Sequence, residues 1–435
     1  MKKMLVWILL FAMIIGLVGC AGESTTTTTA AATTTGAGTT APQEVIKIGL
    51  MVPLTGTQTQ AGVEVQALAK LLEDAINVGV DVNLPIHDGK GLPNLGGAKI
   101  KIVVGDLSTV DIAAAEAERL ITEEKVIGIA GNFSSASTKT AMVAAEKYKA
   151  ILLSEGTSES LTTANYTYFG RTYPGDDTFI RDTFEYIKML NDTKGANIKN
   201  IALCSEDTEF GSNIAKTEVK WAAEYGMNIV ENISYSATAS NVTSEVLRLK
   251  QANADAVIMS SYIADALLFM STFKEQNYFP KMLFGQRGGF ASSDFISKLG
   301  NDADYVFSTA RWNTDFNSSV SKALADLYKS KYSNGKTLIG DVLASAWDVY
   351  MLALIANQAG STDPDKMRAE MKKGIVVNPD QDPTGLPGYV YADNGQNTKT
   401  SAIVVQMKDK EMVTVYPEKY ASAAGIYPAP NWDKR

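Results

Sequence analysis

Two short loops rich in hydroxyl groups are the strongest candidates for chemistry in this 435-residue sequence. Residues 131–138 (GNFSSAST) precede a segment with helical periodicity, and residues 154–157 (SEGT) follow a short apolar run. The first turn of a helix leaves backbone N–H groups without an intrahelical partner, and together with the helix dipole these groups attract anions. Two such loops side by side could hold a carboxylate through neutral donors. Each loop taken alone is also explained by helix capping without a ligand.

The motifs of common enzyme classes are missing from the sequence. No Gly-x-Gly-x-x-Gly follows an expected strand, and there is no Gly-x-Ser-x-Gly nucleophile elbow. Gly335-Lys336-Thr337 resembles the end of a P-loop, but no strand precedes it and residue 330 is a serine. We interpret His87 as a surface residue and Cys204, at the end of an apolar strand, as a buried small hydrophobe. We therefore expect a non-enzyme with no cofactor and no metal site.

The elements that position these loops alternate between strands and helices. Val45–Val52 reads as a strand, 62–77 as an amphipathic helix, and the alternation continues to the strand 151–154. After a loop around 166–173 a second series runs from the helix 177–190 to the strand 281–284, followed by three helices and strands near Tyr389 and at 402–407. Alternating units predict parallel sheets covered by helices, and two series predict two lobes with a cleft. Ligands of such sheets bind beyond the carboxyl ends of the strands, which singles out the loops 53–62, 131–138, 154–160, 205–211 and 285–290.

Composition and charge exclude several classes of protein. Apolar residues make up 45% and charged residues 20%, which is a globular balance, and the length predicts two or more domains. The formal charge of −8 offers no basic surface for a phosphate backbone, so we expect no nucleic acid partner. One histidine and two cysteines are too few for a Cys/His zinc cluster or a disulfide framework.

The N-terminus predicts export and a lipid anchor. Lys2 and Lys3 precede a short apolar run, 4–18, that ends in Gly19-Cys20. This run is too short for an ordinary membrane-spanning helix and suits a signal peptide of residues 1–19, with Cys20 as the lipidated first residue of the mature chain. A short signal-anchor helix is the alternative. Residues 20–43 are rich in Thr and Ala and are expected to form a flexible tether on the outer face of the cytoplasmic membrane.

Blocks along the chain resemble the branched-chain amino acid (leucine/isoleucine/valine) binding proteins, extracytoplasmic receptors that feed ABC importers. The resemblance covers nearly all of residues 45–417 in order and is specific for the family but not for a ligand. It implies a type I periplasmic-binding-protein fold, with two Rossmann-like lobes joined by three hinge crossovers. The blocks are IKIGLMVPLTG at 46–56, GNFSSASTKT at 131–140, LLSEGTSESLT at 152–162, YFGRTYPGDD at 168–177, SEDTEFGSN at 205–213 and AWDVYMLALIANQAGSTDPDKM at 346–367.

The resemblance also implies which residues bind the ligand. In that family, a serine at a helix N-terminus and a threonine two residues after a backbone acceptor hold the ligand's α-carboxylate and α-amine. The corresponding residues are Ser135, Thr157 and, through its backbone carbonyl, Glu155. Phe210 matches an aromatic residue of the second-lobe loop, and Tyr262 matches a wall residue. The family's first-loop aromatic residue is missing, and Ala61 stands at that position.

Position 287 departs from the family pattern in charge. Amino-acid-binding members carry an acidic residue at the third place of Gly285-Gln286-Arg287-Gly288-Gly289, where it neutralises the ligand's ammonium. An arginine would repel an ammonium and could bind a carboxylate bidentately. We hypothesise that the ligand lacks a simple zwitterionic head or carries a second acidic group. Alternatively, Arg287 points away from the ligand or pairs with Glu155, Glu206 or Asp207, which could then supply the ammonium partner.

The expectation is therefore a lipid-anchored, solute-binding receptor that delivers an amino acid or related carboxylate to an ABC permease by hinge closure, acting as a monomer. Lobe 1 would comprise residues 44–170 and 309–400, and lobe 2 residues 171–308 and 401–435. Two alternatives remain at this stage. One is a sensor domain that reports ligand occupancy to a signalling partner, and the other is an extracellular hydrolase.

Overall fold

The computed structural model describes residues 45–56, 58–131, 134–316 and 318–432. The expected signal peptide (1–19), Cys20 and the tether (20–43) lie outside the described residues. The first series of elements forms a five-stranded parallel sheet of order β2-β1-β3-β4-β5. Its elements are β1 (Val45–Val52), α1 (Thr59–Asn77), β2 (Lys99–Asp106), α2 (Ala113–Thr122), β3 (Gly128–Gly131), α3 (Ser135–Tyr148), β4 (Ile151–Leu153), α4 (Glu159–Thr163) and β5 (Phe169–Gly170).

The second series forms a seven-stranded sheet of order β12-β11-β10-β9-β8-β6-β7. Its parallel part, β7-β6-β8-β9-β10, repeats the order of the first sheet, and β11 and β12 pair antiparallel at one edge. The predicted parallel strands are therefore confirmed, and two antiparallel strands extend the second sheet. The elements are α5 (Asp176–Lys194), β6 (Asn200–Glu206), α6 (Glu209–Glu224), β7 (Asn228–Tyr235), α7 (Thr243–Ala252), β8 (Ala256–Ser260), α8 (Ile263–Glu275), β9 (Leu283–Gly285), α9 (Ser293–Leu299), β10 (Phe307–Ala310), β11 (Ile403–Lys408) and β12 (Glu411–Tyr416).

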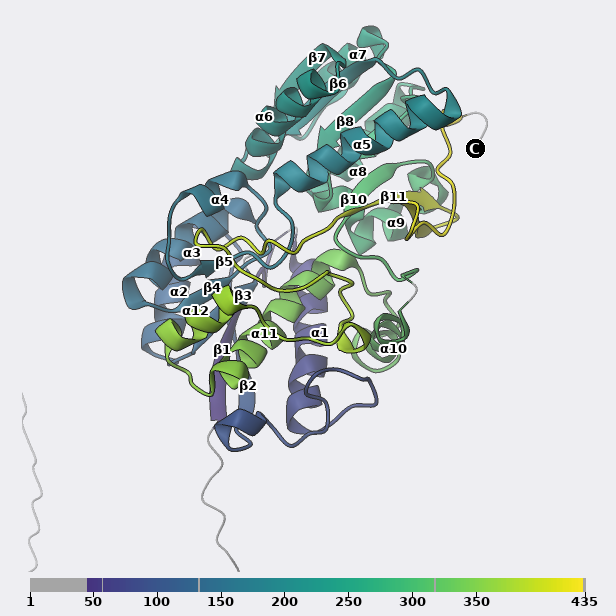
Figure 1. Ribbon diagram of the computed structural model, residues 1–435. Coiled ribbons are helices and arrows are strands. Elements are labelled where there is room, and N and C mark those ends of the chain that lie inside the picture. Colours follow the sequence, from purple (N-terminus) through teal and green to yellow (C-terminus); the bar gives the residue numbers. More distant parts are fainter. Residues whose placement is uncertain (1–44, 57, 132–133, 317, 433–435) are drawn as a thin grey trace, which may run out of the picture. The chain divides into compact units, whose positions relative to one another are not determined.

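Both sheets are covered by helices on both faces, as parallel strands require. Along β1, Ile46, Ile48 and Leu50 pack with α1 and α11 (Gly340–Ala359), whereas Met51 packs on the other face with α2 and α3 (Figure 1). In the second sheet, α5 and α6 cover one face and α7, α8 and α9 the other. Cys204 of β6 is fully buried in this second core, which confirms its interpretation as a hydrophobe.

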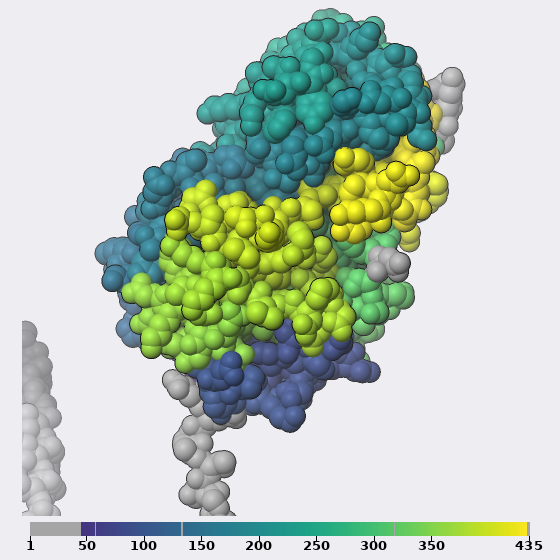
Figure 2. Space-filling model, viewed as in Figure 1, coloured from purple at the N-terminus to yellow at the C-terminus, as the bar shows by residue number. Residues whose placement is uncertain are grey.

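The chain passes between the two sheets three times, which confirms the expected crossovers. The first passage joins β5 to α5, and the second leads from β10 through α10 (Ser319–Leu327) to α11, the core helix of the first lobe. The third leads from α12 (Pro364–Lys373) to β11. The first and third passages run side by side, because Arg171 donates its backbone N–H to the Gly395 carbonyl and accepts from the Asn397 N–H, each at 2.9 Å. Figure 2 shows the yellow C-terminal segment lying against the teal helices of the second lobe.

Some boundaries of the lobes and strands differ from those predicted. The expected lobe boundary between residues 308 and 309 falls inside β10, all of which belongs to the second sheet. The expected strand near Tyr389 is an isolated bridge to Ile375. Among the described residues, α11 alone is long and apolar enough to cross a membrane, and 83% of its apolar window is buried in the protein.

Candidate ligand-binding site

A single cavity brings together all six residues that the family resemblance assigned to ligand binding. Ser135, Glu155 and Thr157 come from the first lobe, and Phe210, Tyr262 and Arg287 from the second. Each follows the carboxyl end of a parallel strand, because both sheets turn this edge toward the cleft. The lining also includes Gly288 and two residues that the sequence analysis did not single out, Arg311 and Asp341.

The two hydroxyl loops meet, as predicted. The Ser135 hydroxyl, at the first residue of α3, accepts the backbone N–H groups of Thr157 and Ser158, both at 3.2 Å. Ser134 caps the same helix and accepts the Ser137 N–H at 3.1 Å. Ser135 and Thr157 are each 2% exposed. These hydrogen bonds join the N-terminus of α3 to the loop after β4 and place the Ser135 hydroxyl beside Thr157, at a helix end that favours an anion.

Two aromatic side chains form the second-lobe wall. Phe210 stands in the first turn of α6, where the capping Thr208 hydroxyl accepts its backbone N–H at 3.2 Å. Tyr262 precedes α8, and its ring centroid lies 5.2 Å from that of Phe210. Burial raises the pKa of the Tyr262 phenol above its usual range. This wall offers apolar contact to a ligand, with one polar edge.

Arg287 is buried and spans from the second lobe to the first. Its Nη2 group donates to Asp176 Oδ1 at 2.6 Å and to the Thr157 hydroxyl at 3.1 Å, and the guanidinium lies 4.1 Å from the centre of the Phe179 ring. Burial lowers the pKa of Arg287 to about 10, against the opposing charge of Asp176, so the group is charged at neutral pH. Arg287 thus does pair with a carboxylate, but with Asp176 and not with Glu155, Glu206 or Asp207.

Arg311 makes a second buried ionic cluster on the same cavity. It directly follows β10 and forms ion pairs with Asp341 and, at 3.4 Å, with Glu155. Its Nη2 group also donates to the Glu155 backbone carbonyl at 2.7 Å. Arg311 was not predicted as a site residue, because β10 was not recognised from the sequence. The sequence around it, VFSTAR, mixes apolar and hydroxyl residues and gives only a weak strand signal.

Burial and the surrounding charges shift the pKa values of both Glu155 and Arg311. Burial raises the pKa of Glu155 well above its usual range, an effect opposed by Arg311 and reinforced by Asp341 and Asp348. The Glu155 carboxyl also accepts the Ser345 hydroxyl. Arg311 itself has a raised pKa, because the charges of Asp341 and Glu155 outweigh the effect of burial. Burial therefore disfavours the charged form of Glu155, whereas the neighbouring carboxyl groups favour the charged form of Arg311.

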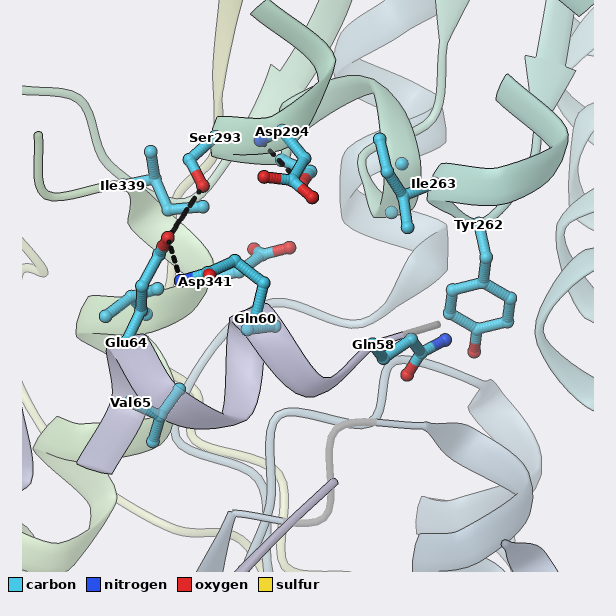
Figure 3. Close-up of a pocket in the computed structure, with 15 residues that line it drawn as sticks. Gln58, Gln60, Glu64, Val65, Tyr262, Ile263, Ser293, Asp294, Ile339 and Asp341 are labelled. Atoms are coloured by element: carbon cyan, nitrogen blue, oxygen red, sulfur yellow. Dashed lines mark hydrogen bonds between the residues drawn. The ribbon is translucent and has the colours of Figure 1, made fainter. Parts of the chain in front are cut away.

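A second, larger cavity adjoins the first and shares Tyr262, Gly288 and Asp341 with it. It is lined mainly by residues of α1, of the loop before α9 and of the start of α11. Figure 3 shows Glu64 of α1 and Ser293 of α9 in contact at one side of it, with Tyr262 and Gln58 at the opposite side. The Glu64 carboxylate accepts the Ser293 hydroxyl at 2.9 Å and pairs with Lys336 at 2.9 Å.

The two lobes are closed on each other at the cleft. Glu209 of α6 accepts the Ser160 hydroxyl at 2.6 Å and pairs with Lys139 of α3 at 3.3 Å. The cavity holding the six residues has a volume of about 20 Å³, and its neighbour about 40 Å³. A water molecule needs roughly 10–15 Å³ by such a measure. A ligand of amino-acid size can therefore enter only when the lobes separate.

The described residues contain no group of three or more His, Cys, Asp or Glu side chains arranged to hold a metal ion. The side chains that line the cavity can recognise a ligand through hydrogen bonds, ion pairs and aromatic contact. Binding of this kind needs donors for an acid group and an enclosed space, and the cavity provides both.

The similarity of this chain to known proteins extends over both lobes. The sequence profile of the periplasmic binding proteins matches residues 45–411. Two proteins of Brucella abortus, named Leu/Ile/Val-binding protein homologs 7 and 8, are 28% and 26% identical to this chain over 398 and 396 residues. Each alignment covers 88% of this chain, and 94% and 93% of the respective relative.

Solved structures share the fold at lower identity. A leucine-binding protein from Thermotoga maritima has a TM-score of 0.70 at 18% identity, covering 85% of this chain and 97% of its own. A branched-chain amino acid binding protein from Streptococcus pneumoniae, in complex with isoleucine, has the same score at 20% identity, covering 85% and 100%. A solute-binding protein from R. palustris, in complex with 4-hydroxybenzoate, also scores 0.70, at 16% identity, covering 90% and 99%.

Proposed function

Because this chain belongs to the periplasmic binding protein family, we propose that it is an extracytoplasmic receptor that captures a small carboxylate and delivers it to an ABC importer. Its fold is the type I periplasmic-binding-protein fold. The observation that carries the proposal is the single cavity lined by hydroxyl, aromatic and charged side chains from both lobes. A receptor that closes around its ligand requires such a shared lining, whereas a site confined to one lobe would not couple binding to closure.

The acid group of the ligand would dock on the first lobe. Ser135 and the N-terminus of α3 supply its donors, and Thr157 lies beside them. The second lobe would then close over the ligand with Phe210, Tyr262 and Arg287. Because the ligand binds the closed state better than the open state, it would shift the population toward the form that a permease recognises. Such a receptor acts as a monomer and without catalysis or a cofactor.

Membrane attachment is the second part of the proposal. The signal-like residues 1–19 and the Thr-rich residues 20–43 support an exported chain attached through lipidated Cys20 to the outer face of the cytoplasmic membrane. Replacing Cys20 with serine should move the protein from the membrane fraction to the soluble extracytoplasmic fraction. Equal membrane retention of the C20S protein would contradict the lipid anchor while leaving ligand capture intact.

Ligand capture is tested first by thermal unfolding of a soluble form that begins at Gln43. The panel contains branched-chain and acidic amino acids, dicarboxylates, 2-oxo acids and aromatic acids. A ligand at one hundred times its Kd adds about 2.7 kcal/mol to the free energy of unfolding, which raises Tm by several degrees. Ser135→Ala should abolish the shift, whereas Ser271→Ala, on an exposed turn of α8, should retain it. A shift that persists in Ser135→Ala would contradict docking at α3.

Delivery to an importer is tested in cells with the ligand found in this panel. Uptake of the radiolabelled compound should require the receptor gene and a permease, and it should fall with the Ser135→Ala receptor. Uptake that is unchanged when the receptor is removed would contradict the transport role.

A further inference from the structure

The groups that would bind a ligand ammonium are already bound to arginine. The family resemblance assigns an α-ammonium to the Glu155 carbonyl, to the Thr157 hydroxyl and to an acidic side chain at position 287. In this structure the Glu155 carbonyl accepts Arg311 Nη2 at 2.7 Å, and the Thr157 hydroxyl accepts Arg287 Nη2 at 3.1 Å. The third position is the arginine itself. Guanidinium groups thus occupy the two remaining acceptors of the ammonium, the Glu155 carbonyl and the Thr157 hydroxyl.

We propose that the ligand is a small carboxylate without an α-ammonium group, with an oxygen acceptor such as a 2-oxo group in its place. The inference rests on the proposed function, because it names the ligand class of the same cavity. Arg287 and Arg311 together act as the specificity determinants. Both line the cavity, and each is held in place by an ion pair with a carboxylate of the protein, Asp176 for Arg287 and Asp341 for Arg311.

The two arginines together disfavour an ammonium more strongly than either arginine would alone. A ligand head group between Thr157 and Glu155 would lie beside both guanidinium groups, and like charges at hydrogen-bond distances repel strongly in a desolvated site. The neighbouring carboxylates do not compensate, because Asp176 is paired with Arg287 and Asn213, and Asp341 with Arg311. The cavity offers an ammonium no unpaired carboxylate partner among these groups.

The same arginines have unused donors for an oxygen. The Nε atoms of Arg287 and Arg311 are buried and have no hydrogen-bond partner among the described residues. A buried donor without a partner costs free energy, and a ligand oxygen within reach would remove that cost. A carbonyl or hydroxyl oxygen next to the carboxylate meets this need, since it is an acceptor of the size of the ammonium that it replaces.

The test compares sets of acids that differ only at the carbon next to the carboxylate. Each set contains an L-amino acid, its 2-oxo acid and the unsubstituted acid, for the skeletons of valine, leucine, glutamate and phenylalanine. Calorimetry on the soluble form beginning at Gln43 should show at least tenfold tighter binding of a 2-oxo acid than of its amino acid. Tighter binding of the amino acid would overturn the inference and leave the receptor function standing. No binding in any set would contradict the inference and the carboxylate receptor together.

Charge-exchanged variants test whether the arginines cause the preference. Arg287→Glu combined with Asp176→Asn restores an acidic residue at position 287 without facing it with a second carboxylate. The Kd of the amino acid divided by the Kd of its 2-oxo acid should fall by at least tenfold. Arg287→Gln with Asp176→Asn is an uncharged second variant that should shift the ratio in the same direction. Arg248→Glu, on an exposed turn of α7, should leave the ratio unchanged. An unchanged ratio in folded double variants, checked by circular dichroism, would overturn the inference.

Discussion

Arg287 lies in a backbone conformation that normally belongs to glycine, with φ 51° and ψ −132°. Such a conformation costs on the order of 1–3 kcal/mol in a residue with a side chain, and it persists only where the surroundings hold it. Here Gly289 allows the loop to press against the start of α8: a Cβ at that position would lie 2.5 Å from the Tyr262 carbonyl carbon. The loop thereby directs the guanidinium toward Thr157 and Asp176. Strain is stored where the second lobe reaches the first.

The first prediction concerns the Arg287–Asp176 pair. Asp176→Asn leaves a fully buried guanidinium without its counterion, which should lower the free energy of unfolding by about 3 kcal/mol. Urea unfolding of the purified variant measures this change. Asp192→Asn, at the exposed end of the same helix, breaks an ion pair with Lys188 that is more than half exposed and should cost less than about 1 kcal/mol. Equal losses of unfolding free energy in the two variants would show that burial does not determine how much the Arg287–Asp176 pair contributes to stability.

The second prediction concerns Asp348, whose side chain accepts the Thr172 hydroxyl at 2.5 Å within the core of the first lobe. Burial raises the pKa of Asp348 to about 7, against the effects of Thr172 and Arg311. The unfolded chain releases this proton near pH 4, so the folded protein binds more protons between pH 4 and 7. Its contribution to stability is therefore present in acid and is lost as the pH rises to about 7.

Asp348→Asn removes the titrating group and keeps the acceptor oxygen. The decrease in Tm between pH 5 and pH 8 should be smaller in this variant than in the wild-type protein, and differential scanning calorimetry at several pH values measures it. Asp326→Asn, at an exposed side chain of α10, serves as the control with a wild-type pH dependence. Parallel curves for Asp348→Asn and the wild type would refute the assignment.

At the scale of elements, helix ends from opposite lobes hold the cleft closed. The first turn of α6 reaches the loop after β4 through Glu209, which accepts the hydroxyls of Ser158 and Ser160. The hydrogen bond from Ser160 lowers the pKa of Glu209, so the carboxylate is ionised at neutral pH. On the other side of the cleft, Glu64 accepts Ser293. Two acidic side chains therefore bind hydroxyl groups across the cleft.

The third prediction follows from this arrangement. Glu209→Gln removes the charge that holds Ser160 and Lys139 and should weaken ligand binding about fivefold, because about 1 kcal/mol of closed-state stabilisation is lost. Calorimetry with the ligand from the thermal panel measures the change. Glu224→Gln makes the same substitution at the exposed end of the same helix and should not alter Kd. Unchanged binding in Glu209→Gln would mean that closure does not depend on this contact.

At the scale of the whole molecule, one buried arginine connects the ligand loop to the crossovers. Arg171, in the first crossover, donates to the carbonyls of Thr157 at 2.8 Å and Ser158 at 2.9 Å. Its Nε donates to Gln396 of the third crossover at 2.5 Å. The side chain is 1% exposed. The position of the binding loop and the course of two hinge segments therefore depend on the same planar group.

The fourth prediction replaces that group with lysine. Lysine keeps the charge, but its single amino group cannot donate to the loop after β4 and to Gln396 at the same time. Arg171→Lys should therefore cost about 2–3 kcal/mol of stability and weaken ligand binding. Urea unfolding and calorimetry measure the two effects. Arg248→Lys, at a half-exposed ion pair, should change neither. Loss of stability without loss of binding would confine the role of Arg171 to the crossovers.

The elements with strong patterns could be predicted from the sequence, and the weakly patterned ones could not. The run VIKIGLMV and the helical spacing after it identified β1 and α1, because burial on both faces demands such residues. The strand β10, with sequence FSTA, is short and half hydroxyl, so no periodicity distinguishes it from a loop. Missing β10 also meant missing Arg311, which follows it.

The sequence by itself determined that Ser135 and Thr157 lie together. Both follow parallel strands of one sheet, and the carboxyl ends of such strands share an edge. The partners of the arginines were decided only by the tertiary structure. Arg287 and Asp176 are 111 residues apart, and Arg311 is 156 residues from the carbonyl of Glu155. No local pattern encodes contacts of that separation, because the first arises when α5 packs beside the loop after β9 and the second when the two lobes meet.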